Sequence, residues 1–231
     1  MNVTTAARLH LILLIVVAIG TYLFLWPGLR IVGVQFPRQS WILTHAMGWR
    51  GGWWLWLLAI FGWMYLLATL AWTYLPAHRA AAMVQSGLMI ISAVLLIAGV
   101  TAWMGVLPVV MAQPDASALL LLVDAFALNF LGAGCLMGGV VTAWIGYDLW
   151  RQRVVSRPWT LFCIGAGLAA IPSPFLFPFP FHLLLTALRW WLWAFYLAVL
   201  PRPHSPFAEY PRANLLTIDP RHADYAIMGK M

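Results

Sequence analysis

The chain has 231 residues, of which 64% are hydrophobic and only 8% are charged. A soluble domain carries about 25% charged residues, so this composition excludes a water-exposed globular fold and predicts an integral membrane protein. The formal net charge is +7, but the chain has a single lysine, Lys230, and its arginines lie singly or in short loops. That distribution does not form the basic stripe typical of a nucleic-acid-binding surface.

Apolar runs long enough to cross a bilayer, about 20 residues each, occur six times. We therefore predict one all-α transmembrane domain over residues 1–201, with spans at about 9–27, 52–76, 83–111, 117–148, 158–181 and 182–201. The first run resembles a signal peptide but lacks an A-x-A cleavage site, so it is expected to remain as a helix. Residues 202–231 form a tail with repeated prolines and short apolar patches. We expect this tail to lie across the cytoplasmic face of the bundle or on a partner.

The placement of arginine predicts that both chain ends are cytoplasmic. With the N-terminus inside, nine basic residues face the cytoplasm and three, Arg30, Arg38 and Arg50, face the outside. Cytoplasmic loops are enriched in Lys and Arg, so this orientation is favoured over its inverse. The expected location is a bacterial inner membrane, with membrane lipids and other integral subunits as partners.

Two segments are expected to depart from regular spans. In the first outer loop, Arg38, Trp41, His45 and Trp49 share one helical face, which predicts a short helix lying in the interface. In the fifth span, four prolines between residues 172 and 180 prevent a continuous helix. We expect an extended apolar strap to complete that crossing. A re-entrant fifth segment is the alternative, disfavoured because it would place the basic tail outside.

Asp124 and Arg189 are the charged residues expected inside spans, where charge is costly and is often functional. Each lies about 10 Å from the outer end of its predicted helix, so we predict an intramembrane Asp124–Arg189 ion pair. Gly134 and Gly138 share the face of Asp124 and form a small-xxx-small pair that permits close helix packing. Asn129 projects to a different face. A paired Asp124 would fix the packing, whereas an unpaired one would mark a proton or cation pathway.

Four histidines are candidate cofactor ligands. His10 and His78 lie near predicted cytoplasmic helix ends, and His45 and His182 lie near the outer side. One pair per leaflet is the arrangement that a two-haem membrane cytochrome needs, and a single histidine can bind a pigment. Because haem-ligating histidines normally lie several residues inside a span, we favour interfacial histidines as the explanation. The cofactor stays unknown, with haem, pigment or quinone as the candidates.

Signatures of soluble and metal-dependent catalysis do not appear in the sequence. Cys135 and Cys163 lie in apolar runs without a CxxC or Cys/His spacing, so zinc, iron–sulfur and dithiol chemistry have no support. GxSxG, HExxH and Gly-rich phosphate-loop motifs are also absent from the sequence. We therefore predict no catalytic residues, and our expectation leans away from an enzyme.

Three functional hypotheses follow from these patterns. The first is a non-catalytic integral subunit of a larger membrane assembly, of the respiratory or photosynthetic electron-transfer kind, packing against partner helices, lipid, and quinone or pigment. The alternative is a small ion-coupled transporter that uses Asp124 and Arg189, with the proline-rich segment as its unwound helix. The third is a di-haem electron carrier that uses the four histidines.

Overall fold

The computed structural model describes residues 3–29, 35–75, 80–113, 117–153, 155–176 and 180–199, and every regular element in these ranges is a helix. The elements are α1 (Val3–Gly20), η1 (Thr21–Leu25), η2 (Trp26–Leu29), α2 (Gln35–Thr44), α3 (Ala46–Tyr74), α4 (Ala80–Thr101), η3 (Ala102–Val106), α5 (Leu107–Met111), α6 (Ser117–Gln152), α7 (Arg157–Ala170), α8 (Ser173–Leu176) and α9 (Pro180–Val199). Residues 202–231, including the predicted tail, lie outside the described residues.

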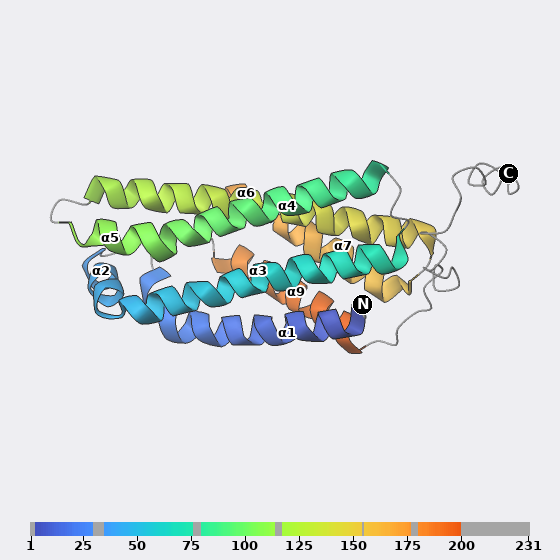
Figure 1. Cartoon of the computed structure of the whole chain (residues 1–231), viewed down its shortest axis with the longest axis horizontal. Coiled ribbons are helices and arrows are strands. Elements are labelled where there is room, and N and C mark those ends of the chain that lie inside the picture. The colour runs from blue at the N-terminus through green and yellow to red at the C-terminus, as the bar shows by residue number, and fades with distance from the viewer. Residues whose placement is uncertain are drawn as a thin grey trace, which may run out of the picture.

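Four helices in the described part of the chain are long and apolar enough to cross a membrane: Val3–Leu29, Ala46–Tyr74, Ala80–Met111 and Ser117–Gln152. They correspond to the first four predicted spans, which supports the expectation of a membrane-embedded helical protein. They form the long bundle of Figure 1. Helix α4 continues through the π-helical turn η3 into α5 despite Pro108. The wider turn accommodates the proline ring and its missing N–H donor.

The predicted fifth and sixth spans fold as an antiparallel hairpin, α7 and α9, joined through α8. The rings of Phe162 and Tyr196 stack at 3.9 Å between the two helices, and the Thr186 hydroxyl donates to the Ala169 carbonyl at 3.1 Å. The expected extended strap is instead partly helical. The N–H groups of Phe175 and Leu176 both donate to the Pro172 carbonyl oxygen, which closes the single turn of α8.

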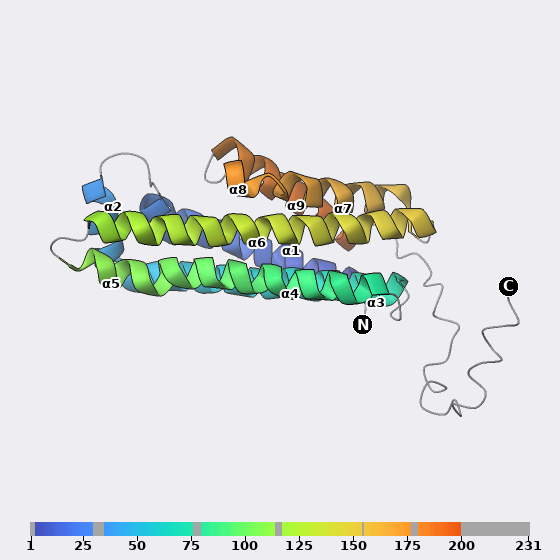
Figure 2. The same cartoon turned by 90° about the horizontal axis from the view of Figure 1, so that it is seen from above.

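The hairpin covers only part of the bundle's length. In Figure 2 it lies along α6 on the side away from α4, and it turns back well before the end that carries α2. The turn packs at Gly132, where an added Cβ would come within 3.0 Å of the Pro174 Cα. From Ser117 to Gly132 a helix rises about 22 Å. The tip of the hairpin therefore lies about 22 Å along α6 from the end of α6 that is near α2.

The first residues of α1 and the last turn of α9 lie at the same end of the bundle (Figure 1). The Arg8 side chain of α1 donates from Nε to the carbonyl oxygen of Ala198 on α9 at 3.4 Å. This contact supplies a partner to one of the final carbonyl groups of α9, which have none within the helix.

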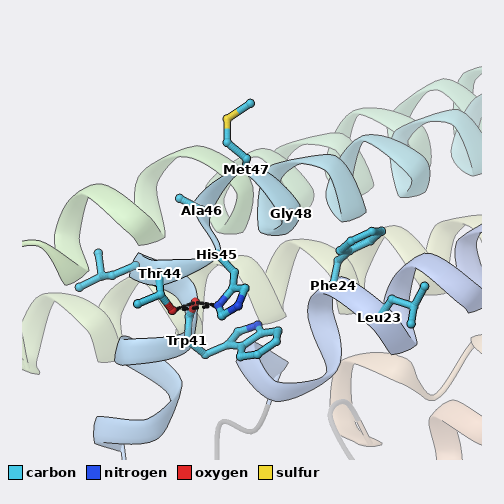
Figure 3. A pocket seen from close by; sticks show the side chains of 9 residues that line it. Leu23, Phe24, Trp41, Thr44, His45, Ala46, Met47 and Gly48 are labelled. Carbon is cyan, nitrogen blue, oxygen red and sulfur yellow. Dashed lines mark hydrogen bonds between the residues drawn. The ribbon is translucent and has the colours of Figure 1, made fainter.

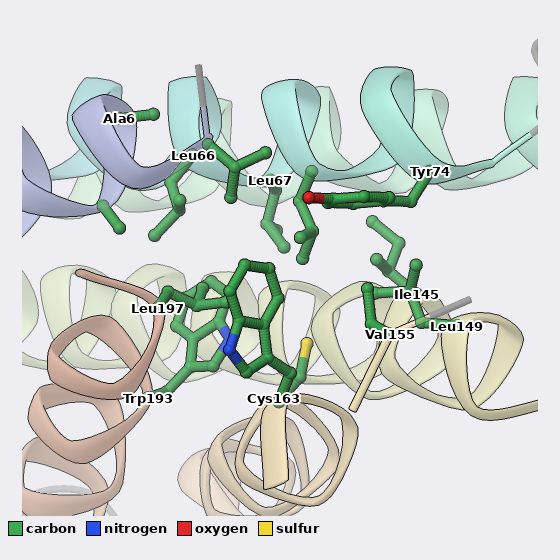
Figure 4. Close-up of a cluster of buried hydrophobic side chains, with 14 of the residues drawn as sticks. Ala6, Leu66, Leu67, Tyr74, Ile145, Leu149, Val155, Cys163, Trp193 and Leu197 are labelled. Carbon is green, nitrogen blue, oxygen red and sulfur yellow. The ribbon is translucent and has the colours of Figure 1, made fainter. Parts of the chain in front are cut away.

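Two hydrophobic clusters fill the bundle. One lies toward the end with the N-terminus and joins α1, α3, α6, α7 and α9 around Tyr74, Trp159 and Trp193; Figure 4 shows Trp193 and Cys163 facing Leu66 and Leu67 of α3. The other lies at the α2 end. It packs the buried residues Leu25, Ile42, Trp49, Trp53, Trp103 and Leu107.

Candidate functional site

The candidate site is built around Asp124, which α6 carries two turns after its start. Its side chain is buried at the α2 end of the bundle. Arg38 of α2 binds it with two parallel hydrogen bonds, Nη1 to Oδ2 at 2.5 Å and Nη2 to Oδ1 at 2.7 Å. This fork-to-fork geometry is the strongest arrangement available to a carboxylate and a guanidinium, because both hydrogen bonds are charge-assisted.

Three further hydrogen bonds complete the site. The indole N–H of Trp103, in the π-helical turn η3, donates to Asp124 Oδ1 at 2.9 Å. Arg38 Nε donates to the Gly28 carbonyl oxygen at 2.7 Å, and Trp49 Nε1 donates to the Trp103 carbonyl oxygen at 2.8 Å. The wider turn at η3 leaves this carbonyl open to a side-chain donor. The site thus ties together η2, α2, α3, η3 and α6.

Gly28 is required for this closure. A Cβ at Gly28 would come within 2.4 Å of the Trp49 ring and 3.1 Å of Ile42. With no side chain there, η2 approaches α2 and α3 closely enough for its carbonyl to reach the Arg38 guanidinium. Gln39 adds a second link from α2, donating from Nε2 to the Met111 carbonyl at 2.6 Å.

This arrangement is suited to holding the helices together. Asp124 accepts three hydrogen bonds, and Arg38 gives three of its five N–H groups to buried acceptors. A buried pair with excellent geometry and filled hydrogen-bonding capacity offsets the cost of removing both charges from water. A carboxylate held in this way has little capacity left for a cation or a transferable proton. We call the group of Arg38, Asp124, Trp103 and Gly28 the arginine clamp.

Arg189 is not the partner of Asp124, contrary to our prediction. Its side chain is exposed, and Nη1 lies 3.5 Å from where a Cβ would stand on Gly165 of α7. The residues beside Gly165 pack against α6 between Gly139 and Gly146, about 22 to 33 Å along α6 from Asp124. The prediction assumed that all spans end at one outer level, but α6 extends far beyond the tip of the α7–α9 hairpin.

The two predicted packing glycines both lie at the contact of α6 with its neighbours. A Cβ on Gly134 would come within 2.7 Å of Leu96, and the Ser92 hydroxyl of α4 donates to the Gly134 carbonyl at 2.8 Å. A Cβ on Gly138 would meet the same hydroxyl at 2.8 Å and the Trp63 ring at 3.2 Å. Gly134 and Gly138 thus let α4 and α3 approach the α6 backbone.

The four candidate histidines are not assembled into a ligand pair in the described part of the chain. His10 is buried on α1 between Gly62 and Trp193, with no hydrogen-bond partner for either ring nitrogen. His182, at the tip of the hairpin, lies 3.0 Å from the Ser173 hydroxyl through Nε2. His45 lies where α2 meets α3 and shares no ring contact or hydrogen bond with His182. His78 lies outside the described residues.

A second buried polar contact, which the sequence reasoning missed, joins α4 and α6 near the opposite end. Gln85 Nε2 donates to Asp148 Oδ2 at 2.8 Å, and both side chains are buried.

Cys135 and Cys163 are free thiols. Within the described ranges no three His, Cys, Asp or Glu side chains come together in a way that would hold a metal ion.

A half-open hollow of about 360 Å³ lies where α2 turns into α3. In Figure 3, His45 lies over the Trp41 ring, Phe24 lies to one side of this pair, and Met47 points away from it. The two rings stack at 3.8 Å, and His45 Nδ1 lies 2.8 Å from the Thr44 hydroxyl. The expected short helix in this loop is present as α2. Of the four residues predicted to share its face, α2 carries only Arg38 and Trp41, and Arg38 turns inward to Asp124. His45 directly precedes α3, and Trp49 lies within α3.

Arg38 and Trp103 are the partners of Asp124 that sequence reasoning missed. One signal was available for Arg38: only three arginines were predicted at the outer end, and Asp124 was predicted near the same end of its helix. Pro108 signals a distortion of that helix, but no residue pattern specifies the π-helical turn that aims Trp103. Comparison with known protein families, with curated proteins and with solved structures finds no match for this chain.

Proposed function

We propose that this protein is a non-catalytic integral subunit of a larger membrane assembly, of the respiratory or photosynthetic electron-transfer kind. The arginine clamp is the observation that carries the proposal. An ionisable residue inside a membrane bundle is a transport or catalytic candidate by default, and here the strongest such candidate is used to hold helices together. Asp148 and His182 are likewise engaged by Gln85 and Ser173.

We infer the position of the bilayer from the charged side chains of the described residues. The described part of the bundle carries no charged side chain between the level of Arg38 and Asp124 and the level of the exposed Arg189 guanidinium. The separation is roughly 28 Å along α6, close to the 30 Å hydrocarbon core of a bilayer. We place the hydrocarbon core between these two levels. Arg189 then reaches the boundary by extending its side chain toward the headgroups.

This placement gives four full crossings and one re-entrant hairpin instead of six spans. The turn at α8 lies about 12 Å below Asp124, from Asp124 to Gly132 along α6, and so ends inside the hydrocarbon core. Irregular backbone at that depth is tolerated where protein covers it, and Gly132 of α6 lies directly against Pro174. Because α7 and α9 enter and leave on the same side, α9 ends on the side of the N-terminus. We place that side in the cytoplasm of a bacterial inner membrane.

The outer faces of the helices would contact lipid, partner helices, and quinone or pigment. Large apolar side chains are exposed along the bundle, among them Trp54 (58%), Trp72 (62%) and Phe126 (53%). Interfacial tryptophans of this kind anchor helices at the headgroups and provide flat surfaces for partners. Above the tip of the hairpin, the α2 half of α6 has no cover from α7 or α9 (Figure 2).

The test is the native mass of the particle extracted from its own membrane in a very mild detergent. We expect a particle of several hundred kilodaltons whose other subunits are recovered reproducibly, and which loses its integrity when the clamp is broken by Arg38→Met. A monomer or small homo-oligomer of the unmodified protein would contradict the proposal.

A small ion-coupled transporter is the second candidate, and one observation favours it. Paired half-depth helices with a buried polar tip occur at the binding sites of secondary transporters, and the α7–α9 hairpin carries His182 and Ser173 at its tip. Asp124 and Arg189 are too far apart to form one site in that mechanism. A monomeric native particle with ion-dependent uptake sensitive to His182→Ala would move this candidate ahead of the subunit.

A further inference from the structure

A basic hollow of about 620 Å³ lies at the end of the bundle opposite the arginine clamp, where α6 ends and α7 begins. It is lined by Tyr147, Trp150, Arg151, Arg153, Val155, Ser156 and Arg157. We call it the arginine hollow. It is separate from the clamp and from the hollow at His45, and neither the assembly role nor the transport role uses it.

The backbone turn between the two helices gathers the three arginines. Arg153 adopts a left-handed conformation with φ of 53°, and its N–H donates to the Trp150 carbonyl at 3.2 Å, closing the last turn of α6. An arginine rarely adopts this conformation, because its Cβ crowds the backbone there. The sharp reversal brings Arg151, at the end of α6, onto the same hollow as Arg157, at the start of α7.

The three guanidinium groups have no carboxylate partner in the described part of the chain. All three side chains are exposed, and the ion pair found within the described ranges is Arg38–Asp124. Asp148 is the nearest acidic residue along the sequence, and it is buried and accepts a hydrogen bond from Gln85. Within the described ranges the arginine hollow therefore has no carboxylate counter-charge, and it suits an anion with several oxygen acceptors, which guanidinium groups bind through paired hydrogen bonds.

Two aromatic side chains of the hollow, Tyr147 and Trp150, indicate that the anion belongs to a lipid surface. Tyr147 and Trp150 are each about half exposed (49% and 51%), with ring centroids 6.0 Å apart. Aromatic side chains with one apolar and one polar end prefer the glycerol and headgroup level of a bilayer. In the bilayer position proposed above, Tyr147 lies on the cytoplasmic side of the hydrocarbon core, about one to two turns of α6 beyond its inner edge. The hollow therefore faces headgroups and combines cations with a surface for glycerol and acyl carbons.

We propose that the arginine hollow binds the phosphate of an anionic phospholipid from the inner leaflet. Basic pockets between transmembrane helices on the cytoplasmic side recognise acidic headgroups in this way. A zwitterionic phosphatidylcholine carries a choline cation beside its phosphate, so three clustered arginines disfavour it. The inference stands apart from the assembly proposal, because a lipid site of this kind serves a monomer equally well.

The experiment measures lipid binding to the full-length protein, purified in detergent, by native mass spectrometry. Dioleoylphosphatidylglycerol is the anionic probe, dioleoylphosphatidylcholine the zwitterionic probe, and inorganic phosphate the free anion. The pocket variant is R151Q/R153N, with Asn at 153 because it tolerates the left-handed conformation. The control variant, R50Q/R189Q, removes two exposed arginines elsewhere and changes the net charge equally.

We expect the unmodified protein to prefer phosphatidylglycerol over phosphatidylcholine by about tenfold, as the loss of charge-assisted hydrogen bonds implies. R151Q/R153N should lose that preference and R50Q/R189Q should keep it. Equal loss in both variants would mean general charge attraction and would overturn the proposal. Equal binding of the two lipids by the unmodified protein would also overturn it, whether or not the variants fold. Displacement of phosphatidylglycerol by millimolar inorganic phosphate would identify a free-anion site instead of a lipid site.

Discussion

Gly139 of α6 and Gly167 of α7 lie backbone against backbone. A Cβ added to Gly139 would come within 2.6 Å of the Gly167 carbonyl oxygen, and a Cβ on Gly167 within 2.5 Å of the Gly139 carbonyl oxygen. Neither obstacle is a flexible side chain, so neither can move aside cheaply. This contact, together with Gly146 packed against Cys163 and Ile164, seats the hairpin on α6.

The first prediction concerns that contact. Gly167→Ala should separate α7 from α6 and lower the stability of the bundle by about 1–3 kcal/mol, the usual cost of overpacking a tight core. The measurement is the thermal or SDS-induced unfolding midpoint of the detergent-solubilised protein. Gly87→Ala is the matched control, because its added Cβ meets nothing within 4 Å on a helix. Equal midpoints for Gly167→Ala and the unmodified protein would mean that the hairpin is not seated this tightly.

The second prediction concerns the arginine clamp. Arg38→Met leaves the Asp124 carboxylate buried with Trp103 as its remaining donor, and breaking a buried pair in this way costs about 3–5 kcal/mol. Replacing both charges, as in R38M/D124L, should restore part of that loss, since no unpaired charge stays behind. The readout is the unfolding midpoint, with Arg189→Gln as the exposed control.

A charge exchange separates the two candidate partners of Asp124. R38D/D124R should be better assembled than either single variant, because the pair is re-formed with its charges reversed. D124R/R189D should gain nothing over its single variants, since the two sites lie far apart along α6. Rescue by the second exchange and not by the first would contradict the pairing found in the structure.

The contrast between Arg38 and Arg189 shows what the sequence could and could not predict. Hydropathy and charge located the long apolar helices, and helical periodicity predicted the short helix that carries Arg38 and Trp41. The inward face of α6 was also expected, because Asp124 shares it with Gly134 and Gly138. Each of these features repeats along the chain with a fixed period or length.

The levels of the helices relative to one another were not predictable in the same way. Apolar composition continues along α6 well past one bilayer thickness, so nothing local indicates that the hairpin turns back at Gly132. A correct prediction of the partner of Asp124 required knowing where along α6 the hairpin turns back, because that point sets the level of Arg189. The π-helical turn that aims Trp103 is likewise a response to packing around Pro108, and residue preferences alone do not specify it.

The third prediction isolates the hydrogen bond from Trp103. Trp103→Phe removes the N–H donor to Asp124 while keeping an aromatic ring against Trp53, with which Trp103 has a centroid distance of 5.3 Å. A hydrogen bond to a charged group contributes about 1.5–3 kcal/mol, so the unfolding midpoint should fall measurably. In the D124N background the same substitution should cost less. Trp72→Phe, at a residue 62% exposed, should have little effect, and an equal loss at both positions would point to ring packing as the cause.

The last prediction tests the re-entrant hairpin by cysteine accessibility in intact cells. In a chain whose own thiols are removed by C135A/C163A, Phe175→Cys places a thiol on α8, where the phenylalanine is 84% exposed. If the hairpin turns back inside the hydrocarbon core, a membrane-impermeant maleimide should not label this thiol from the outside, because it faces lipid. Met47→Cys, at a residue 81% exposed at the α2 end, should label from the outside. Ser156→Cys, at the opposite end, should label only after the cytoplasmic side is opened. Labelling of Phe175→Cys from the outside at the rate of Met47→Cys would mean that α7 and α9 cross the bilayer completely, and would restore the six-span topology.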